Sequence, residues 1–162
     1  MENWQITSIL SSRTRLRVFR TMAFVPTTNS EIREWLLRFH ATNDSLDVSR
    51  LEDIYTKDAK VQFGNMPPFE GLDELRNLLK GNWARLEMMH HEIESFDMVD
   101  NKIYQPCHIT WKVKNDPEKE TIVVPAFAFI HLEMSGEDKG LVKQAAYYMD
   151  GAPLMAALQR SL

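Results

Sequence analysis

Disulfide bonds, membrane-spanning segments and phosphate-binding loops are all missing from this sequence. Its single cysteine, Cys107, cannot form an internal disulfide. No apolar run reaches the length of about 20 residues that a spanning helix needs, and no glycine-rich phosphate loop is present. The net charge of −4 gives no general attraction to nucleic acid or an anionic membrane, so neither is an expected partner. What remains is a globular chain of 162 residues, enough for one domain with a buried core.

The first 21 residues differ in composition from the rest of the chain. They contain one acidic residue, several Ser and Thr, and the arginines Arg13, Arg15, Arg17 and Arg20. This composition is typical of a mitochondrial transit peptide, and a disordered tail or a true start at Met22 are the alternatives. We expect a disordered or targeting-like extension over residues 1–28 and a folded domain over residues 29–162. A single cysteine suits a reducing compartment, so a cytoplasmic protein is expected unless the extension directs it to mitochondria.

The spacing of apolar residues predicts an order of helices and strands. Helices are expected from Asn29, Asp47, Gly71 and Gly151, and strands over residues 59–63, 91–99, 103–113, 121–132 and 141–149. Short turns join the last four strands, and strands joined in this way are antiparallel neighbours. The expected fold class is α+β: a curved antiparallel sheet with helices packed on one face, cone-shaped with a central pocket.

Three segments carry a resemblance to a known family: residues 58–61, residues 65–71 with the Pro67-Pro68 turn, and residues 147–150. In order and spacing they resemble the SnoaL-like polyketide cyclase family within the nuclear-transport-factor-2-like superfamily. The resemblance covers about residues 30–160. It implies the conical α+β fold, a small enzyme without a cofactor, and a homodimer formed through the outer face of the sheet.

Several catalytic residues of that superfamily are absent here. Limonene epoxide hydrolase is similar at Asn65, but its tyrosine falls on Phe63. Of its Asp-Arg-Asp triad, the arginine falls on Cys107, the first aspartate on Ile109 and the last aspartate on Tyr147. Without a carboxylate or guanidinium, epoxide hydrolysis by that route is excluded. The general base of ketosteroid isomerase also falls near Phe63.

Two further comparisons leave candidates open. Of the two histidines of scytalone dehydratase, one falls near His90 or His91 and the other on Val113. The aspartate of the SnoaL-type cyclases falls on Tyr147, or on Asp150 if the alignment shifts. Asp150 also precedes the last predicted helix, where an aspartate typically caps the helix.

Side-chain alternation along the strands separates an inner face from an outer one. Pairing through the turn at residues 115–118 places His108 opposite Pro125. The inner face then carries Cys107, Ile109, Trp111, Ala126, Ala128 and Tyr147, and the outer face carries His108, Phe127, Phe129, His131, Tyr148 and Asp150. Two phenylalanines on the outer face predict burial against a second copy of the chain.

The candidate catalytic residues are His91 as acid or base, Asn65 to orient a carbonyl or water, and Tyr147 to donate a proton to an oxyanion. Their alternatives are a surface histidine, a turn asparagine and a core tyrosine. Candidate substrate-binding residues are Phe63, Trp83, Met89, Cys107, Ile109 and Trp111. No histidine stands at metal-ligand spacing from a cysteine or glutamate, so no metal is expected.

Two hypotheses for function follow. The first is a cofactor-independent isomerase, cyclase or dehydratase acting on an apolar, carbonyl-bearing small molecule, for example in secondary metabolism. The second is a non-catalytic module of the same fold that binds a small molecule or dimerises. The missing carboxylates favour the second hypothesis, whereas His91 at the pocket favours the first.

Overall fold

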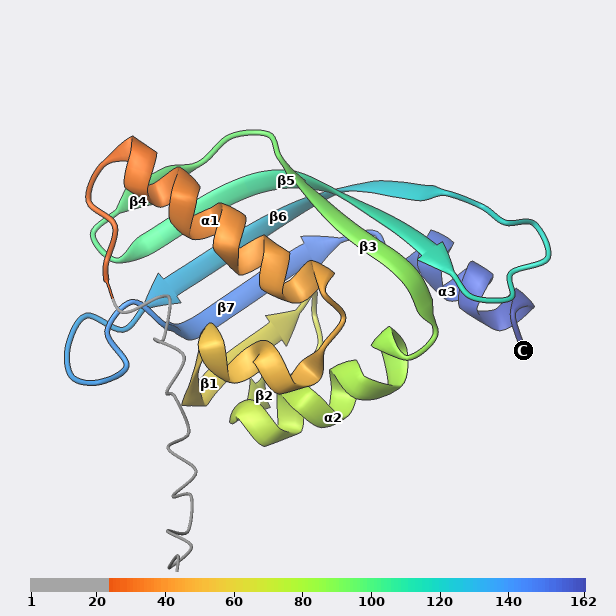
Figure 1. The fold of residues 1–162 in the computed structure, drawn as a ribbon, viewed down its shortest axis with the longest axis horizontal. Helices are drawn as coiled ribbons and strands as arrows, with labels where there is room; N and C mark the ends of the chain where they lie inside the picture. The colour runs from red at the N-terminus through yellow and green to blue at the C-terminus, as the bar shows by residue number, and fades with distance from the viewer. Residues whose placement is uncertain (1–23) are drawn as a thin grey trace, which may run out of the picture.

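The computed structural model describes residues 24–162, so the predicted targeting segment of the first 21 residues lies outside the described residues (Figure 1). The helices are α1 (Asn29–Asp44), the 3₁₀ helix η1 (Val48–Asp53), α2 (Leu72–Trp83) and α3 (Ala152–Arg160). The strands are β1 (Tyr55–Phe63), β2 (Phe69–Glu70), β3 (Leu86–Ile93), β4 (Asp97–Val99), β5 (Lys102–Val113), β6 (Ile122–Leu132) and β7 (Val142–Met149). The α+β class is therefore confirmed.

One sheet contains all these strands, in the order β2-β1-β7-β6-β5-β3 with β4 beside β5. The predicted antiparallel run from β5 to β7 is present, and His108 pairs with Pro125 as expected. The sheet is nevertheless mixed, because β1 pairs with β7 in parallel. No short turn links these two strands, so the local turn signals that predicted the other pairings contained nothing about this one.

The helices cover one face of the curved sheet (Figure 1). Helix α1 begins after Thr28, whose side chain and that of Glu31 form a capping box, and it buries Trp35, Leu36 and Phe39. Helix α2 buries Leu72, Leu75 and Trp83, and α3 buries Ala157 and Leu158. These side chains join the inner face of the sheet in one core.

Strand β3 begins earlier than the sequence predicts. The expected start was near His91, at the junction with the preceding helix, but the strand begins at Leu86 and His91 lies well inside it. Leu86 follows Trp83 at helical spacing and therefore imitates a continuation of α2, although the helix ends at Trp83. As a result His91 pairs with Ile109 on the inner face, whereas His90 pairs with Thr110.

Candidate functional site

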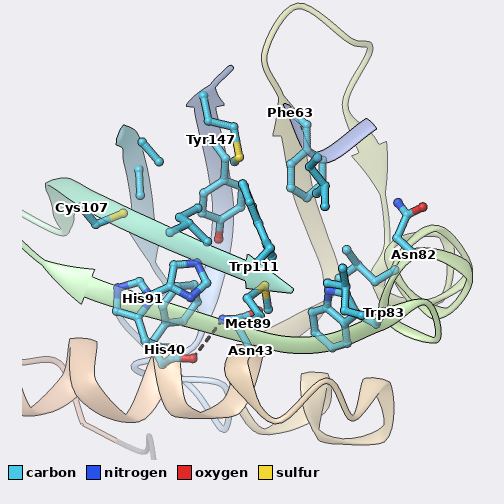
Figure 2. Close-up of a pocket in the computed structure, with 18 of the residues that line it drawn as sticks. His40, Asn43, Phe63, Asn82, Trp83, Met89, His91, Cys107, Trp111 and Tyr147 are labelled. Carbon is cyan, nitrogen blue, oxygen red and sulfur yellow. Dashed lines mark hydrogen bonds between the residues drawn. The ribbon is translucent and has the colours of Figure 1, made fainter. Parts of the chain in front are cut away.

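A cavity of about 210 Å³ lies between the sheet and the helices (Figure 2). Eight of the nine predicted site residues line it: His91, Tyr147, Phe63, Trp83, Met89, Cys107, Ile109 and Trp111. They come from β1, α2, β3, β5 and β7, so residues distant in sequence form one surface. Most of the lining is apolar and aromatic, and none of the lining residues within the described part of the chain, residues 24–162, is a lysine or arginine.

Asn65 is the exception, and its predicted position in the pocket is wrong. It is exposed in the turn after β1 and is not part of the cavity lining. Strand alternation would place it on the same face as Phe63. Gly64 breaks that alternation, because its backbone adopts φ +55° while its N–H donates to the Tyr147 carbonyl at 2.8 Å. The exposed position of Asn65 matches the alternative interpretation, an asparagine in a turn.

An aspartate from α1 holds His91 at the cavity wall. Oδ1 of Asp44 lies 2.5 Å from Nδ1 of His91, and Oδ2 accepts the backbone N–H of His91 at 3.0 Å. Both side chains are largely buried. Within residues 24–162, no hydrogen bond involves Nε2 of His91, and this atom is not among the buried unpaired ones. The arrangement fixes one ring nitrogen and leaves the other available to a ligand.

A second imidazole supports the first. The ring of His40 stacks on that of His91, with centroids 4.5 Å apart and planes inclined by 20° (Figure 2). Nε2 of His40 lies 2.7 Å from Nε2 of the fully buried Gln105. Burial lowers the pKa of His40 to about 3, with a further contribution from His91, so His40 is neutral at physiological pH.

Two tyrosine hydroxyls form another polar point on the cavity wall. Tyr55 and Tyr147 come from the parallel strands β1 and β7, and their hydroxyl oxygens lie 2.8 Å apart. Burial raises the pKa of both phenols, so both stay protonated. Only one proton can lie between the two oxygens, which leaves the other O–H free to donate to a ligand.

The remaining candidates are packing residues or caps. Burial raises the pKa of the Cys107 thiol to about 11, so it lines the cavity as a thiol and not as a thiolate nucleophile. Asp150 is exposed and precedes Gly151, the N-cap residue of α3. Its Oδ1 accepts the Ala152 N–H at 2.9 Å, so this side chain binds the start of the helix, as the capping interpretation expects, and is not part of the cavity lining. Within residues 24–162, no cluster of histidine, cysteine and acidic side chains is arranged to hold a metal ion.

Sequence reasoning missed His40, Asp44 and Tyr55. A signal for the first two was present, because His40 and Asp44 are four residues apart and continue the apolar stripe of α1 beyond Phe39. Polar side chains at such positions are directed toward the interior. Tyr55 had no comparable signal, since its role depends on the parallel pairing of β1 with β7.

The fold defines the class: the chain has the fold of the nuclear-transport-factor-2-like proteins, and the predicted resemblance to SnoaL-like polyketide cyclases is confirmed at this level. A protein described as a SnoaL-like polyketide cyclase from Jannaschia sp. CCS1 is 13% identical, with a TM-score of 0.65 over 82% of this chain and 95% of that one. TsrD from Streptomyces laurentii is 13% identical, with a TM-score of 0.62 over 85% and 100%.

A nuclear-transport-factor-2-like protein of unknown function from Burkholderia pseudomallei is also similar, at 12% identity and a TM-score of 0.59 over 78% of this chain and 92% of that one. No family model and no curated protein matches the sequence. In addition, no helix among residues 24–162 is long and apolar enough to cross a membrane.

Proposed function

We propose that this protein is a cofactor-independent enzyme that transfers protons on a neutral, apolar, carbonyl-bearing small molecule, in an isomerisation, cyclisation or dehydration. One observation carries the proposal: Asp44 holds Nδ1 of His91 at 2.5 Å, while Nε2 has no hydrogen-bond partner among residues 24–162 and the ring lines an apolar cavity. A histidine oriented by a carboxylate and bordering a water-poor pocket is suited to general acid–base catalysis.

The proposed proton transfer uses two groups of the cavity. Nε2 of His91 removes a proton from the carbon next to the carbonyl, and the Asp44 carboxylate stabilises the imidazolium that forms. The free hydroxyl proton of the Tyr55–Tyr147 pair donates a hydrogen bond to the developing enolate oxygen. Return of the proton to another carbon gives an isomer. Alternatively, the enolate carbon attacks a second carbonyl carbon of the substrate, whose C=O π bond opens to an alkoxide that takes the histidine proton. In a dehydration, the enolate instead expels hydroxide from the β-carbon, and the hydroxide leaves as water with the histidine proton.

The similar structures support this class of chemistry without selecting one reaction. Proteins described as SnoaL-like polyketide cyclases share the fold, which favours a small-molecule substrate and makes cyclisation one of the three candidates. The apolar lining and the absence of lysine and arginine from it favour a neutral substrate.

Exchange of carbon-bound hydrogen tests the proposal before the natural substrate is known. 1-Tetralone is incubated with the protein in D₂O, exchange of its α-hydrogens is followed by NMR, and binding is measured by quenching of Trp83 and Trp111. We expect the protein to accelerate exchange and His91→Ala to reduce it by about 10²–10⁴-fold. His108→Ala is the matched control, because His108 is on the less buried face of β5 and is not part of the cavity lining.

If the ketone binds in the cavity but its α-hydrogens do not exchange faster, the proposed catalytic activity is contradicted. That result favours the second hypothesis, a module that binds a small molecule without changing it. Equal loss of exchange in His91→Ala and His108→Ala also contradicts the proposed role of His91.

A further inference from the structure

Helix α3 forms one wall of the cavity. Leu154, Met155 and Leu158 line the cavity from this helix. Met155 is also 63% exposed, so the cavity borders solvent at this helix. A displacement of α3 would therefore widen the opening of the cavity.

The attachment of α3 to the rest of the fold is concentrated near its C-terminal end. The helix has nine residues, which is too short to be stable without tertiary contacts, and only Ala157 and Leu158 are buried. At its N-terminal end the chain passes through Gly151, where a Cβ atom would meet nothing within 4 Å. The chain is therefore not packed against another element on this side of Gly151.

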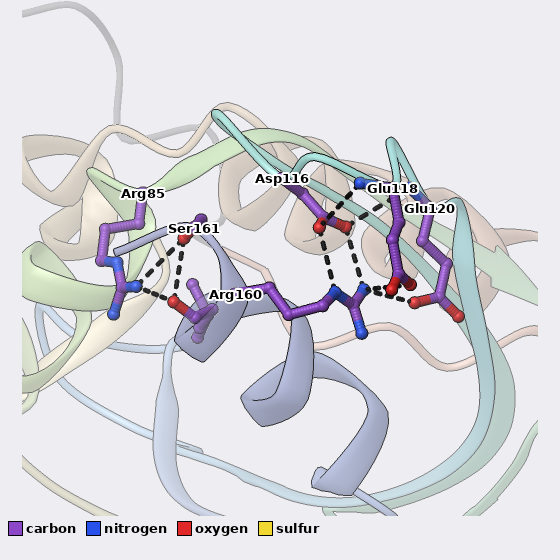
Figure 3. A network of polar contacts seen from close by, with 7 residues as sticks. Arg85, Asp116, Glu118, Glu120, Arg160 and Ser161 are labelled. Atoms are coloured by element: carbon purple, nitrogen blue, oxygen red, sulfur yellow. Dashed lines mark hydrogen bonds and ion pairs between the residues drawn. The ribbon is translucent and has the colours of Figure 1, made fainter.

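Arg160 makes the main polar attachment (Figure 3). Its Nε and Nη2 atoms donate to the two carboxylate oxygens of Asp116 at 3.1 and 3.0 Å, and Nη2 also donates to Glu120 at 2.7 Å. Asp116 is almost fully buried in the β5–β6 loop, and its carboxylate also accepts the N–H groups of Glu118 and Glu120. The acceptor is thus rigidly held, whereas the donor belongs to α3.

A second arginine holds the end of the same helix. Nη2 of Arg85, which lies between α2 and β3, donates to the Leu158 carbonyl and to Oγ of Ser161 at 3.1 Å. This contact satisfies a carbonyl of the last turn that has no partner within the helix. Both arginines bind the C-terminal end from other elements of the fold, whereas the hydrogen bond from Ala152 to Asp150 at the N-terminal end is local to the connection. A movement of α3 would therefore pivot at the Gly151 end.

We infer that α3 is a movable wall of the cavity and that Arg160 is its latch, so that a ligand passes when the Arg160–Asp116 pair opens. This inference rests on the proposed function only in requiring that the cavity bind a small apolar molecule. It does not require proton transfer. A failure of hydrogen exchange with intact binding therefore leaves the latch testable.

The rate of ligand exchange tests the latch. The probe is 2-acetylnaphthalene, a neutral bicyclic ketone, and stopped-flow quenching of Trp83 and Trp111 gives its association and dissociation rates. In Arg160→Met the aliphatic length is kept and the ion pair is lost. We expect both rates to rise about tenfold together, with the dissociation constant changed by less than about twofold. Arg160→Lys retains the positive charge but cannot form the bidentate contact with Asp116, so it should give intermediate rates.

Lys143→Met is the matched control, because it removes the ion pair of Lys143 with Glu133, neither of which lines the cavity. It should leave both rates unchanged, and circular dichroism should show that each variant folds. Asp116 is not substituted, because its loss would also release the loop. Unchanged rates in Arg160→Met overturn the latch. A faster dissociation alone, with weaker binding, shows a fixed wall and also overturns it, as does a wild-type protein that does not bind the probe.

Discussion

The hydroxyl oxygens of Tyr55 and Tyr147 lie 2.8 Å apart although the two residues are separated by 92 positions in the chain. Tyr55 is buried and Tyr147 is half-buried at the cavity, and each hydroxyl is the hydrogen-bond partner of the other. Removing one hydroxyl leaves the other buried without a protein partner, whereas removing both leaves two apolar rings in contact.

This relationship predicts non-additive stability. Tyr55→Phe and Tyr147→Phe should each lower the free energy of unfolding by about 1–2 kcal/mol, and the double variant should cost less than the sum. Urea denaturation of the four proteins measures the difference. Additive losses would show that the hydroxyls do not depend on each other.

The Asp44–His91 pair predicts the tautomer of the histidine. In the wild-type protein, the Nδ1 proton of His91 should be detectable by ¹⁵N–¹H NMR as a strongly hydrogen-bonded proton, and Asp44→Asn should abolish that signal. The same variant should reduce ketone hydrogen exchange by about 100-fold while binding is retained. Unchanged exchange in Asp44→Asn would remove the carboxylate from the proposed mechanism.

His40 predicts a stability that falls in acid. Its folded pKa of about 3 lies below the ordinary value of 6.5, so the unfolded chain binds more protons between these pH values. Above pH 6.5 His40 is neutral in both the folded and the unfolded chain, so its full contribution to the free energy of unfolding is present. As the pH falls from 6.5 toward 3, this contribution decreases by about 1.4 kcal/mol per pH unit. Denaturation of the wild type and His40→Phe at pH 7 and pH 4.5 isolates this slope, which the variant should lack. A difference between the two proteins that does not change with pH would contradict the assignment.

The outer face of the sheet predicts self-association. Val123 is 56% exposed. Tyr148 is 47% exposed and pairs with Phe127, which is 40% exposed and also contributes to the cavity lining. We propose a homodimer through this face, and Val123→Glu or Tyr148→Glu should convert it to a monomer in sedimentation equilibrium. Glu137→Ala in the β6–β7 loop is a control that should keep the wild-type mass. A monomeric wild-type protein at micromolar concentration would rule out the dimer.

Substitution of Asn65 should have little effect on ligand binding or hydrogen exchange. Because it lies in an exposed turn outside the cavity, Asn65→Ala should leave binding of 1-tetralone and its hydrogen exchange within about twofold of the wild type. Titration by tryptophan fluorescence measures the first quantity and NMR the second. A larger loss would place this side chain in the site after all.

The sequence predicted those parts of the fold that local patterns encode. Strand alternation and short turns placed His108 opposite Pro125 and brought Cys107, Trp111 and Tyr147 to one face. The errors arose where one local feature overrides the pattern, as Gly64 does before Asn65. Contacts between distant elements, such as Asp44 with His91, depend on how α1 crosses the sheet, and periodicity contains no information about that crossing.

The parallel pairing of β1 with β7 also determines when the cavity can exist. β1 remains without this neighbour until residues 142–149 have been synthesised, and the backbone bond from Val142 to Ile54 joins the two only then. Pairings over such long sequence separations form late in folding, since they close large loops. A partly folded or shortened chain therefore has no binding site, and ligand binding reports that the whole domain has been assembled.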